Sequence, residues 1–250
     1  MDEAFALIPA TSAMPVLLVC DHASNAVPPP YGSLGLEAGL FDTHIAYDIG
    51  AAEVTRSLAA AWGCAALLGG WSRLLIDLNR GADDPTLVMK ISDGSLVPGN
   101  RHADAKEVAA RIARFHALYH AAISAELKRI ASPIIISIHS FTPAWKGRPR
   151  PWQLGVLCGR DDRLARPLMR VFEEAGFVVG DNEPYHGALE GDTLDTHGTK
   201  LGHANVLVEI RQDLVADAAM ARAFAGRLKP LLDAALAAMA QSAHSRESAK

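Results

Sequence analysis

The sequence predicts an α/β protein, a three-layer α/β/α sandwich around a mostly parallel mixed sheet. Two observations predict this fold. Short apolar runs, typical of strands that are buried on both faces, alternate along the chain with longer helical patterns. Several of these runs also stop at polar residues, and ligands bind at the carboxyl ends of strands in open α/β sheets. The clearest example is the isoleucine-rich run 134–138, which is followed at once by His139.

Taken in order, each element follows from its local pattern. Strands are predicted where four to six apolar residues stand between turn signals, and helices where apolar residues recur every three or four positions. Asp42 or Thr43 supplies an N-cap for the first helix. The predicted strands cover 16–20, 64–68, 74–78, 134–138, 154–158, 177–179 and 205–210, the predicted helices cover 42–62, 105–130, 163–175 and 216–240, and long loops cover 81–104, 142–152 and 181–203.

Composition limits the class of protein. The chain has 250 residues, of which 50% are hydrophobic, and this favours one domain over 1–240 followed by a polar tail at 241–250. A net charge of -4 provides no basic field for nucleic acid. We predict neither a signal peptide nor a membrane span, because a basic leader and a run of 18 uncharged apolar residues are both missing, and we expect the cytoplasm. The oligomeric state stays open.

The three cysteines belong to this apolar framework. Cys20, Cys64 and Cys158 all lie in apolar runs, and their spacing suits no zinc knuckle. We therefore predict reduced core residues rather than disulfides.

Polar side chains at the predicted strand ends form the inventory of a metallohydrolase. Neutral imidazoles bind Zn²⁺ in catalytic sites, and a carboxylate that is not a ligand can take a proton from water. One arginine can stabilise an oxyanion while another holds a substrate carboxylate. The residues at these positions are His22, Arg73, Asn79, Arg80, His139 and Glu209.

Two further groups of residues are weaker candidates for a functional site. The loop 142–152 is rigid, basic and aromatic, so Arg148 and Arg150 are candidates for binding an anionic substrate. His116 and His120 lie four residues apart on a predicted helix, but no acidic partner is near. We interpret this pair as buried or boundary histidines rather than metal ligands.

Four motifs together resemble the N-formylglutamate amidohydrolase family over about 16–214, namely Asp21–Asn25, Trp71–Arg80, Ile138–Pro143 and Glu209–Asp213. The family is itself distantly similar to the zinc carboxypeptidases. The resemblance implies that Asn79 and Arg80 bind a substrate carboxylate, that His139 is a zinc ligand and that Glu209 is the catalytic carboxylate.

The third metal ligand departs from the carboxypeptidase pattern. That pattern begins with His-x-x-Glu, whereas this chain has His22-Ala-Ser-Asn25, and asparagine is a poor zinc ligand. We choose His44, which has Asp48 four residues on to orient its ring. Asp21 and Asp48 are the alternatives for this position.

The resemblance implies a metal-dependent amidohydrolase, with Zn²⁺ or another divalent ion as cofactor and a small N-acyl amino acid as substrate. N-Formyl-L-glutamate would yield formate and L-glutamate, a step in histidine breakdown. Glu209 would activate water and Arg73 would stabilise the oxyanion. The alternatives are a related zinc amidase or peptidase with a different acyl or amino-acid specificity, and a non-catalytic carboxylate-binding protein.

Overall fold

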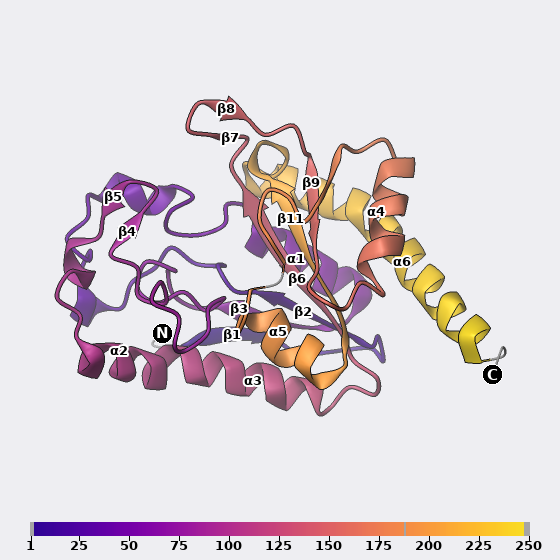
Figure 1. Cartoon of the computed structure of the whole chain (residues 1–250), viewed down its shortest axis with the longest axis horizontal. Coiled ribbons are helices and arrows are strands. Elements are labelled where there is room, and N and C mark those ends of the chain that lie inside the picture. The colour runs from indigo at the N-terminus through magenta and orange to yellow at the C-terminus, as the bar shows by residue number, and fades with distance from the viewer. Residues whose placement is uncertain (1–2, 188, 248–250) are drawn as a thin grey trace.

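A computed structural model describes residues 3–187 and 189–247 of the chain, and a seven-stranded mixed sheet lies at its centre (Figure 1). The strand order is β1-β3-β2-β6-β11-β9-β10. The four strands β3, β2, β6 and β11 are mutually parallel, whereas β1 and the pair β9–β10 run in the opposite direction. The strands are β1 (Phe5–Ile8), β2 (Val16–Cys20), β3 (Ala65–Gly69), β6 (Ile134–Phe141), β9 (Leu154–Leu157), β10 (Val179–Asp181) and β11 (Ala204–Arg211).

Helices cover both faces of the sheet and complete the predicted sandwich. One face carries α1 (Ala51–Trp62), α4 (Ala165–Glu174) and α6 (Ala218–Glu247). The other face carries α2 (Ala105–Arg111), the π-helical turn η4 (Ile112–His116), α3 (Ala117–Leu127) and the short α5 (Thr193–His197). Small hairpins and 3₁₀ turns fill the connections: β4 (Ile91–Ser92), β5 (Ser95–Leu96), β7 (Ala144–Trp145), β8 (Arg148–Pro149), η1 (Pro29–Tyr31), η2 (Ala38–Asp42), η3 (Pro98–Asn100), η5 (Thr199–Leu201) and η6 (Gln212–Leu214).

Burial on two sides explains the continuous apolar runs. In β2, Leu18 and Cys20 pack into the core on the α1 side, whereas Leu17 and Val19 pack into the core on the α3 side, and all of them are fully buried. A strand with helices on both faces has no polar face, so its sequence does not alternate. The same geometry keeps Cys20, Cys64 and Cys158 buried as free thiols, as predicted.

The predictions for two elements near the carboxyl edge of the sheet are wrong. The residues 74–78 are buried turns rather than a strand. The first long helix begins at Ala51 instead of Asp42, because Gly50 adopts a left-handed φ of 79° and residues 43–49 form turns and bends before it. His44 and Asp48 therefore do not share a helix face.

Smaller differences concern the ends of the chain. β1 was not predicted, and it pairs antiparallel with β3 at the sheet edge. The helix α6 includes most of the polar segment 241–250, since it extends to Glu247, and residues 248–250 lie outside the described part of the chain. Among the helices that the structure describes, none combines the length and the hydropathy of a membrane span.

Candidate active site and metal centre

The candidate site is a cavity of about 500 Å³ at the carboxyl ends of the central strands. Glu209 of β11 is the register partner of His139 on β6, so these two side chains enter the cavity from neighbouring strands on the same face of the sheet. His22 follows β2 by two residues and lines the same cavity. The parallel topology thus gathers the predicted strand-end residues, as it does in other open α/β sheets.

The ring of His22 is held by two carboxylates. Its Nε2 lies 2.7 Å from Asp77 Oδ1, and its Nδ1 lies 3.4 Å from Asp48 Oδ2. When Nε2–H donates to Asp77, the lone pair of Nδ1 is directed at the space beside Asp48. Asp48 itself is tied to this strand end, because its backbone N–H donates to the carbonyl oxygen of His22 over 3.0 Å.

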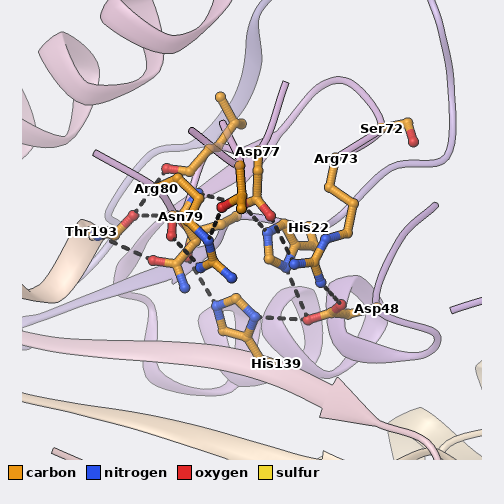
Figure 2. Close-up of polar contacts among 12 residues, drawn as sticks. His22, Asp48, Ser72, Arg73, Asp77, Asn79, Arg80, His139 and Thr193 are labelled. Atoms are coloured by element: carbon orange, nitrogen blue, oxygen red, sulfur yellow. Dashed lines mark hydrogen bonds and ion pairs between the residues drawn. The ribbon is translucent and has the colours of Figure 1, made fainter. Parts of the chain in front are cut away.

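His139 repeats this arrangement on the neighbouring strand. Its Nε2 lies 3.0 Å from Asp21 Oδ2, and its Nδ1 lies 2.7 Å from Asp48 Oδ2. In Figure 2, dashed lines join both rings to the Asp48 carboxylate. Each imidazole therefore has a carboxylate on its outer nitrogen, which is the pairing that orients metal-binding histidines.

Three side chains fit a divalent cation. One ligand atom from each of His22, Asp48 and His139 lies within 4.8 Å of the others, and all three residues are buried. Two imidazole nitrogens and one carboxylate oxygen are a donor set typical of catalytic zinc. The surrounding charge agrees with this assignment, because the three carboxylates of Asp21, Asp48 and Asp77 are buried around the two rings, and Arg73 pairs with only Asp48 and Asp77 among them.

Hydrogen bonds and nearby positive charges keep the supporting carboxylates ionised. Burial alone would raise the pKa of Asp21, but hydrogen bonding and charge from His139, with help from His22 and Thr193, lower that pKa to about 2. Burial is likewise outweighed at Asp77, where Arg73 and His22 hold the pKa of the carboxyl well below its usual range. Both groups can therefore accept hydrogen bonds from the outer nitrogens of the two rings.

His44 lies apart from this group of ligands. Its Nε2 lies 3.0 Å from Asp93 Oδ2 at the edge of the cavity, and its side chain is 33% exposed. The physical reason is the late start of α1, which places His44 in a turn. The geometry favours Asp48, one of the two alternatives, as the third ligand, while Asp21 supports His139.

Glu209 has the features of a proton acceptor. The residue is 5% exposed and lines the cavity, and its Oε2 is buried without a hydrogen-bond partner among the described residues. Burial, together with the charge of Asp48, raises the pKa of Glu209 to about 7. A structural salt bridge does not account for the carboxylate, because Arg211 pairs with Asp213 and Arg73 pairs with Asp77.

Arg73 lines the cavity beside the metal group. Its Nη2 donates to Asp77 Oδ2 over 2.8 Å, and its Nη1 lies 3.6 Å from Asp48 Oδ1. The side chain is buried enough to be fixed and exposed enough to reach a substrate oxygen, since it also lines the cavity. A guanidinium keeps its charge in such a position.

Asn79 and Arg80 also line the cavity, and their neighbours fix their positions. Asn79 Oδ1 accepts a hydrogen bond from the Thr193 backbone N–H over 3.1 Å. Arg80 Nη1 donates to the Asn79 carbonyl over 2.9 Å, and its Nε donates to Thr86 Oγ1 over 3.3 Å. An amide N–H and a guanidinium fork on adjacent residues can together bind one carboxylate.

The two arginines of the loop 142–152 occupy different positions. Arg148 and Arg150 are not among the described residues that line the cavity. Arg148 is exposed on β8, whereas Arg150 stacks over the ring of Tyr185, 5.2 Å from its centroid, and donates to Thr142 Oγ1 over 3.0 Å. Tyr185 and Thr142 line the cavity, so Arg150 contacts two residues of the cavity wall without lining the cavity itself.

Sequence reasoning missed the bond between Asp77 and His22 and the supporting role of Thr193. Asp77 had a usable signal, because a carboxylate inside the apolar run 74–78 is costly unless it is paired, and it binds both His22 and Arg73. Thr193 lies in a long polar loop of the sequence and offered no signal, yet its Oγ1 donates to Asp21 Oδ1 over 2.7 Å.

Comparison with known proteins identifies the family of this chain. The family model for N-formylglutamate amidohydrolase matches residues 14–216. The crystal structure of gene product Atu2144 from Agrobacterium tumefaciens is 34% identical and superposes with a TM-score of 0.90, covering 95% of this chain and 96% of that one.

A second solved structure shares the fold at lower identity. The N-formylglutamate amidohydrolase from Ralstonia eutropha JMP134 is 21% identical, with a TM-score of 0.65 and coverage of 96% of this chain and 98% of that one. A comparison with curated proteins found no match. The extent of the family match shows that the chain belongs to the N-formylglutamate amidohydrolase family and is a hydrolase of linear amide C–N bonds.

Proposed function

We propose that this amidohydrolase is metal-dependent and removes the acyl group of a small N-acyl amino acid, with N-formyl-L-glutamate as the first candidate substrate. The observation that carries the proposal is the buried group His22, Asp48 and His139 beside the unpartnered carboxylate oxygen of Glu209. Zn²⁺ or another divalent ion held by those three residues would polarise the amide carbonyl and make water more acidic.

The side chains of the protein supply the remaining chemistry. Glu209 accepts a proton from the attacking water as the new C–O bond forms on the formyl carbon, and then passes this proton to the leaving amine as the C–N bond breaks. Arg73 donates to the oxygen on which negative charge develops. Formate and a free amino acid are the products, and no redox partner is required.

Asn79 and Arg80 form a carboxylate clamp in this proposal, that is, a pair of adjacent donors that binds the substrate α-carboxylate. Both residues line the cavity, and among the described residues neither Asn79 Nδ2 nor Arg80 Nη2 has a hydrogen-bond partner, whereas Arg80 Nε and Nη1 contact Thr86, Asp84 and the Asn79 carbonyl. Arg148 lies outside the cavity, and Arg150 contributes through the wall formed with Tyr185 and Thr142. With its carboxylate fixed at one end of the cavity, the substrate would have its scissile amide positioned at the metal group at the other end.

We also propose that the reaction is a step in histidine breakdown, as the family resemblance suggests, and that it takes place in the cytoplasm. A second candidate is an amidase that removes a different acyl group or prefers a different amino acid, because the cavity of about 500 Å³ is roomy for N-formylglutamate. A protein that only binds carboxylates is disfavoured, because such a protein has no use for the buried carboxyl group of Glu209.

A substrate screen tests the proposal. Purified protein is incubated with N-formyl and N-acetyl derivatives of glutamate, glutamine, aspartate and leucine, and the released amine is measured with and without a chelator. We expect turnover of N-formyl-L-glutamate that the chelator abolishes and that added Zn²⁺ restores. Absence of turnover on every compound, or turnover that persists in chelator, would contradict the proposal.

A further inference from the structure

The segment 71–80 carries Arg73, Asn79 and Arg80, but it has no strand partner to satisfy its buried backbone. Several of its N–H groups donate to backbone carbonyls of other loops, and side chains satisfy several of its carbonyl oxygens. Four carbonyl oxygens of the segment accept hydrogen bonds from side chains outside it: Leu74 from Asn100 at 2.7 Å, Leu75 from Arg111 at 2.9 Å, Leu78 from His120 at 3.0 Å and Arg80 from His116 at 2.8 Å. Three of these four donors belong to the continuous helix α2–η4–α3.

The last two bonds bracket the carboxylate clamp. His120 Nε2 donates to the carbonyl before Asn79, and His116 Nε2 donates to the carbonyl of Arg80. The two rings lie one above the other, with centroids 4.1 Å apart. The π-helical turn η4 ends at His116, and such turns are frequent at functional sites.

The proton positions of the cluster follow from its contacts. His120 Nε2–H donates to the carbonyl oxygen of Leu78, so Nδ1 of the same ring is a hydrogen-bond acceptor. His197 Nε2–H donates to this Nδ1 over 2.8 Å. Burial, with the nearby histidine charges, lowers the pKa of His120 to about 3, and burial lowers the pKa of His197 to about 4. Each ring is therefore neutral near pH 7 and has a single N–H to give.

The short helix α5 fixes the clamp from the opposite side. His197 stands in its last turn, and Thr193 in its first turn donates a backbone N–H to Asn79 Oδ1. This bond uses the amide oxygen of Asn79 and leaves Nδ2, at the cavity wall, without a hydrogen-bond partner among the described residues. The side chain of Asn79 is thus held by α5. The carbonyl groups of the residues on either side, Leu78 and Arg80, are held by His120 and His116.

We propose that His116 and His120 are positioning residues of the carboxylate clamp. They do not contact the substrate; their N–H groups set the path of the backbone at 78–80 and so aim Asn79 Nδ2 and the guanidinium of Arg80. The inference rests on the proposed function of these two residues as a clamp. It assigns a role to the pair His116 and His120, which the sequence alone presents as structural histidines.

Paired substitutions separate the hydrogen bond from the packing of the ring. His116→Gln and His120→Gln keep an N–H near the position of Nε2, whereas His116→Met and His120→Met keep volume and lose the donor. Ile123→Val is the control, because Ile123 is fully buried on α3 in the same core. The two histidines are replaced separately, so that one variant remains informative when the other does not fold.

The main readout is the Kd of glutarate, a dicarboxylate without an amide bond, measured by calorimetry alongside the KM and kcat for N-formyl-L-glutamate. We expect each Met variant to weaken glutarate binding and raise KM on the order of 10-fold or more, with metal content unchanged and kcat altered far less. The Gln variants should stay near wild type, and Ile123→Val should lower the Tm without moving the Kd.

Glutarate binding keeps the two proposals distinct. A wild-type protein that binds glutarate but hydrolyses no N-acyl amino acid would overturn the proposed function, while the ratio of Kd values would still decide the role of the histidines. The inference fails if the Met variants bind glutarate as tightly as wild type does, if the Gln variants lose as much affinity as the Met variants, or if wild type does not bind glutarate.

Discussion

At the scale of single residues, Glu209 is the carboxylate on which the proposed chemistry depends. Its Oε2 is buried without a partner among the described residues, and it enters the cavity beside His139. In Glu209→Gln the side chain keeps its size but cannot accept the proton of water. We expect kcat to fall by about 10²–10⁴-fold, the usual contribution of general acid–base catalysis.

Metal content and melting temperature distinguish this role from a structural one. Glu209→Gln should bind metal as the wild type does and should melt at a similar temperature, because Glu209 is not in the group of metal ligands and makes no salt bridge through Oε2. A stable, metal-loaded variant with normal kcat would refute the assignment of Glu209 as the base.

Arg80 provides a second test at this scale. The change Arg80→Lys keeps the positive charge but loses the planar fork that binds a carboxylate through two hydrogen bonds. We expect KM for N-formyl-L-glutamate to rise about 10-fold or more, since bonds to a charged group contribute about 1.5–3 kcal/mol each. The matched control is Arg148→Lys, an exposed arginine outside the cavity, for which KM should not change. Equal effects of the two changes would contradict the clamp.

At the scale of elements, much of the sheet could be predicted from the sequence, because a strand that is buried on both faces has an unmistakable apolar run. The run 134–138 became β6, and the alternation of strands with helices gave the sandwich. The segment 74–78 has the same composition but is not a strand. Its buried carbonyls are satisfied by Asn100, Arg111, His116 and His120, and the pattern of one segment does not reveal such distant partners.

The metal group could be predicted only in part, for a related reason. His22 lies two residues after β2 and His139 lies within β6, so their convergence at one sheet edge could be inferred from the pattern. The third position depends on the loop before α1, whose course is set by the left-handed Gly50 and by the hydrogen bond from Asp48 N–H to His22. Loop geometry of this kind has no periodic signature, so His44 was the first choice and Asp48 an alternative.

The helix histidines predict a change in pH-dependent stability. The folded pKa of His120 is lowered to about 3 from an ordinary 6.5, so between these values the unfolded chain holds a proton that the folded chain does not. Lowering the pH therefore reduces the contribution of His120 to the unfolding free energy. In His120→Gln the residue cannot be protonated, and the variant should gain unfolding free energy relative to wild type as pH falls below 6.5, by about 1.4 kcal/mol per pH unit.

Urea unfolding of both proteins at pH 7.5, 6.5, 5.5 and 4.5 measures this difference. Comparing two proteins cancels the opposing contributions of Glu209 and Asp192, whose raised pKa values of about 7 and about 6 are present in both. A difference in unfolding free energy that is constant across this range would show that His120 is not a buried neutral histidine.

At the scale of the whole molecule, the parallel order β3-β2-β6-β11 brings residues from distant parts of the sequence to one sheet edge. His22, Asp48, His139 and Glu209 come from four separate segments, and none of these segments forms the group alone. The organisation of 1–240 as one domain stays a prediction, as does the identity of the substrate. The central claim is that these segments together build one divalent-metal site that the amidohydrolase reaction requires.

The number of metal ions per chain, measured by mass spectrometry after dialysis and compared with turnover, tests this claim most directly. We expect one divalent ion per wild-type chain, a large loss of ion and turnover in Asp48→Asn, and retention of both in His44→Ala, because Asp48 belongs to the group that could hold the ion, whereas His44 contacts Asp93 instead. An Asp48→Asn protein that keeps its ion and its turnover, or a metal-free wild type that is fully active, would contradict the account.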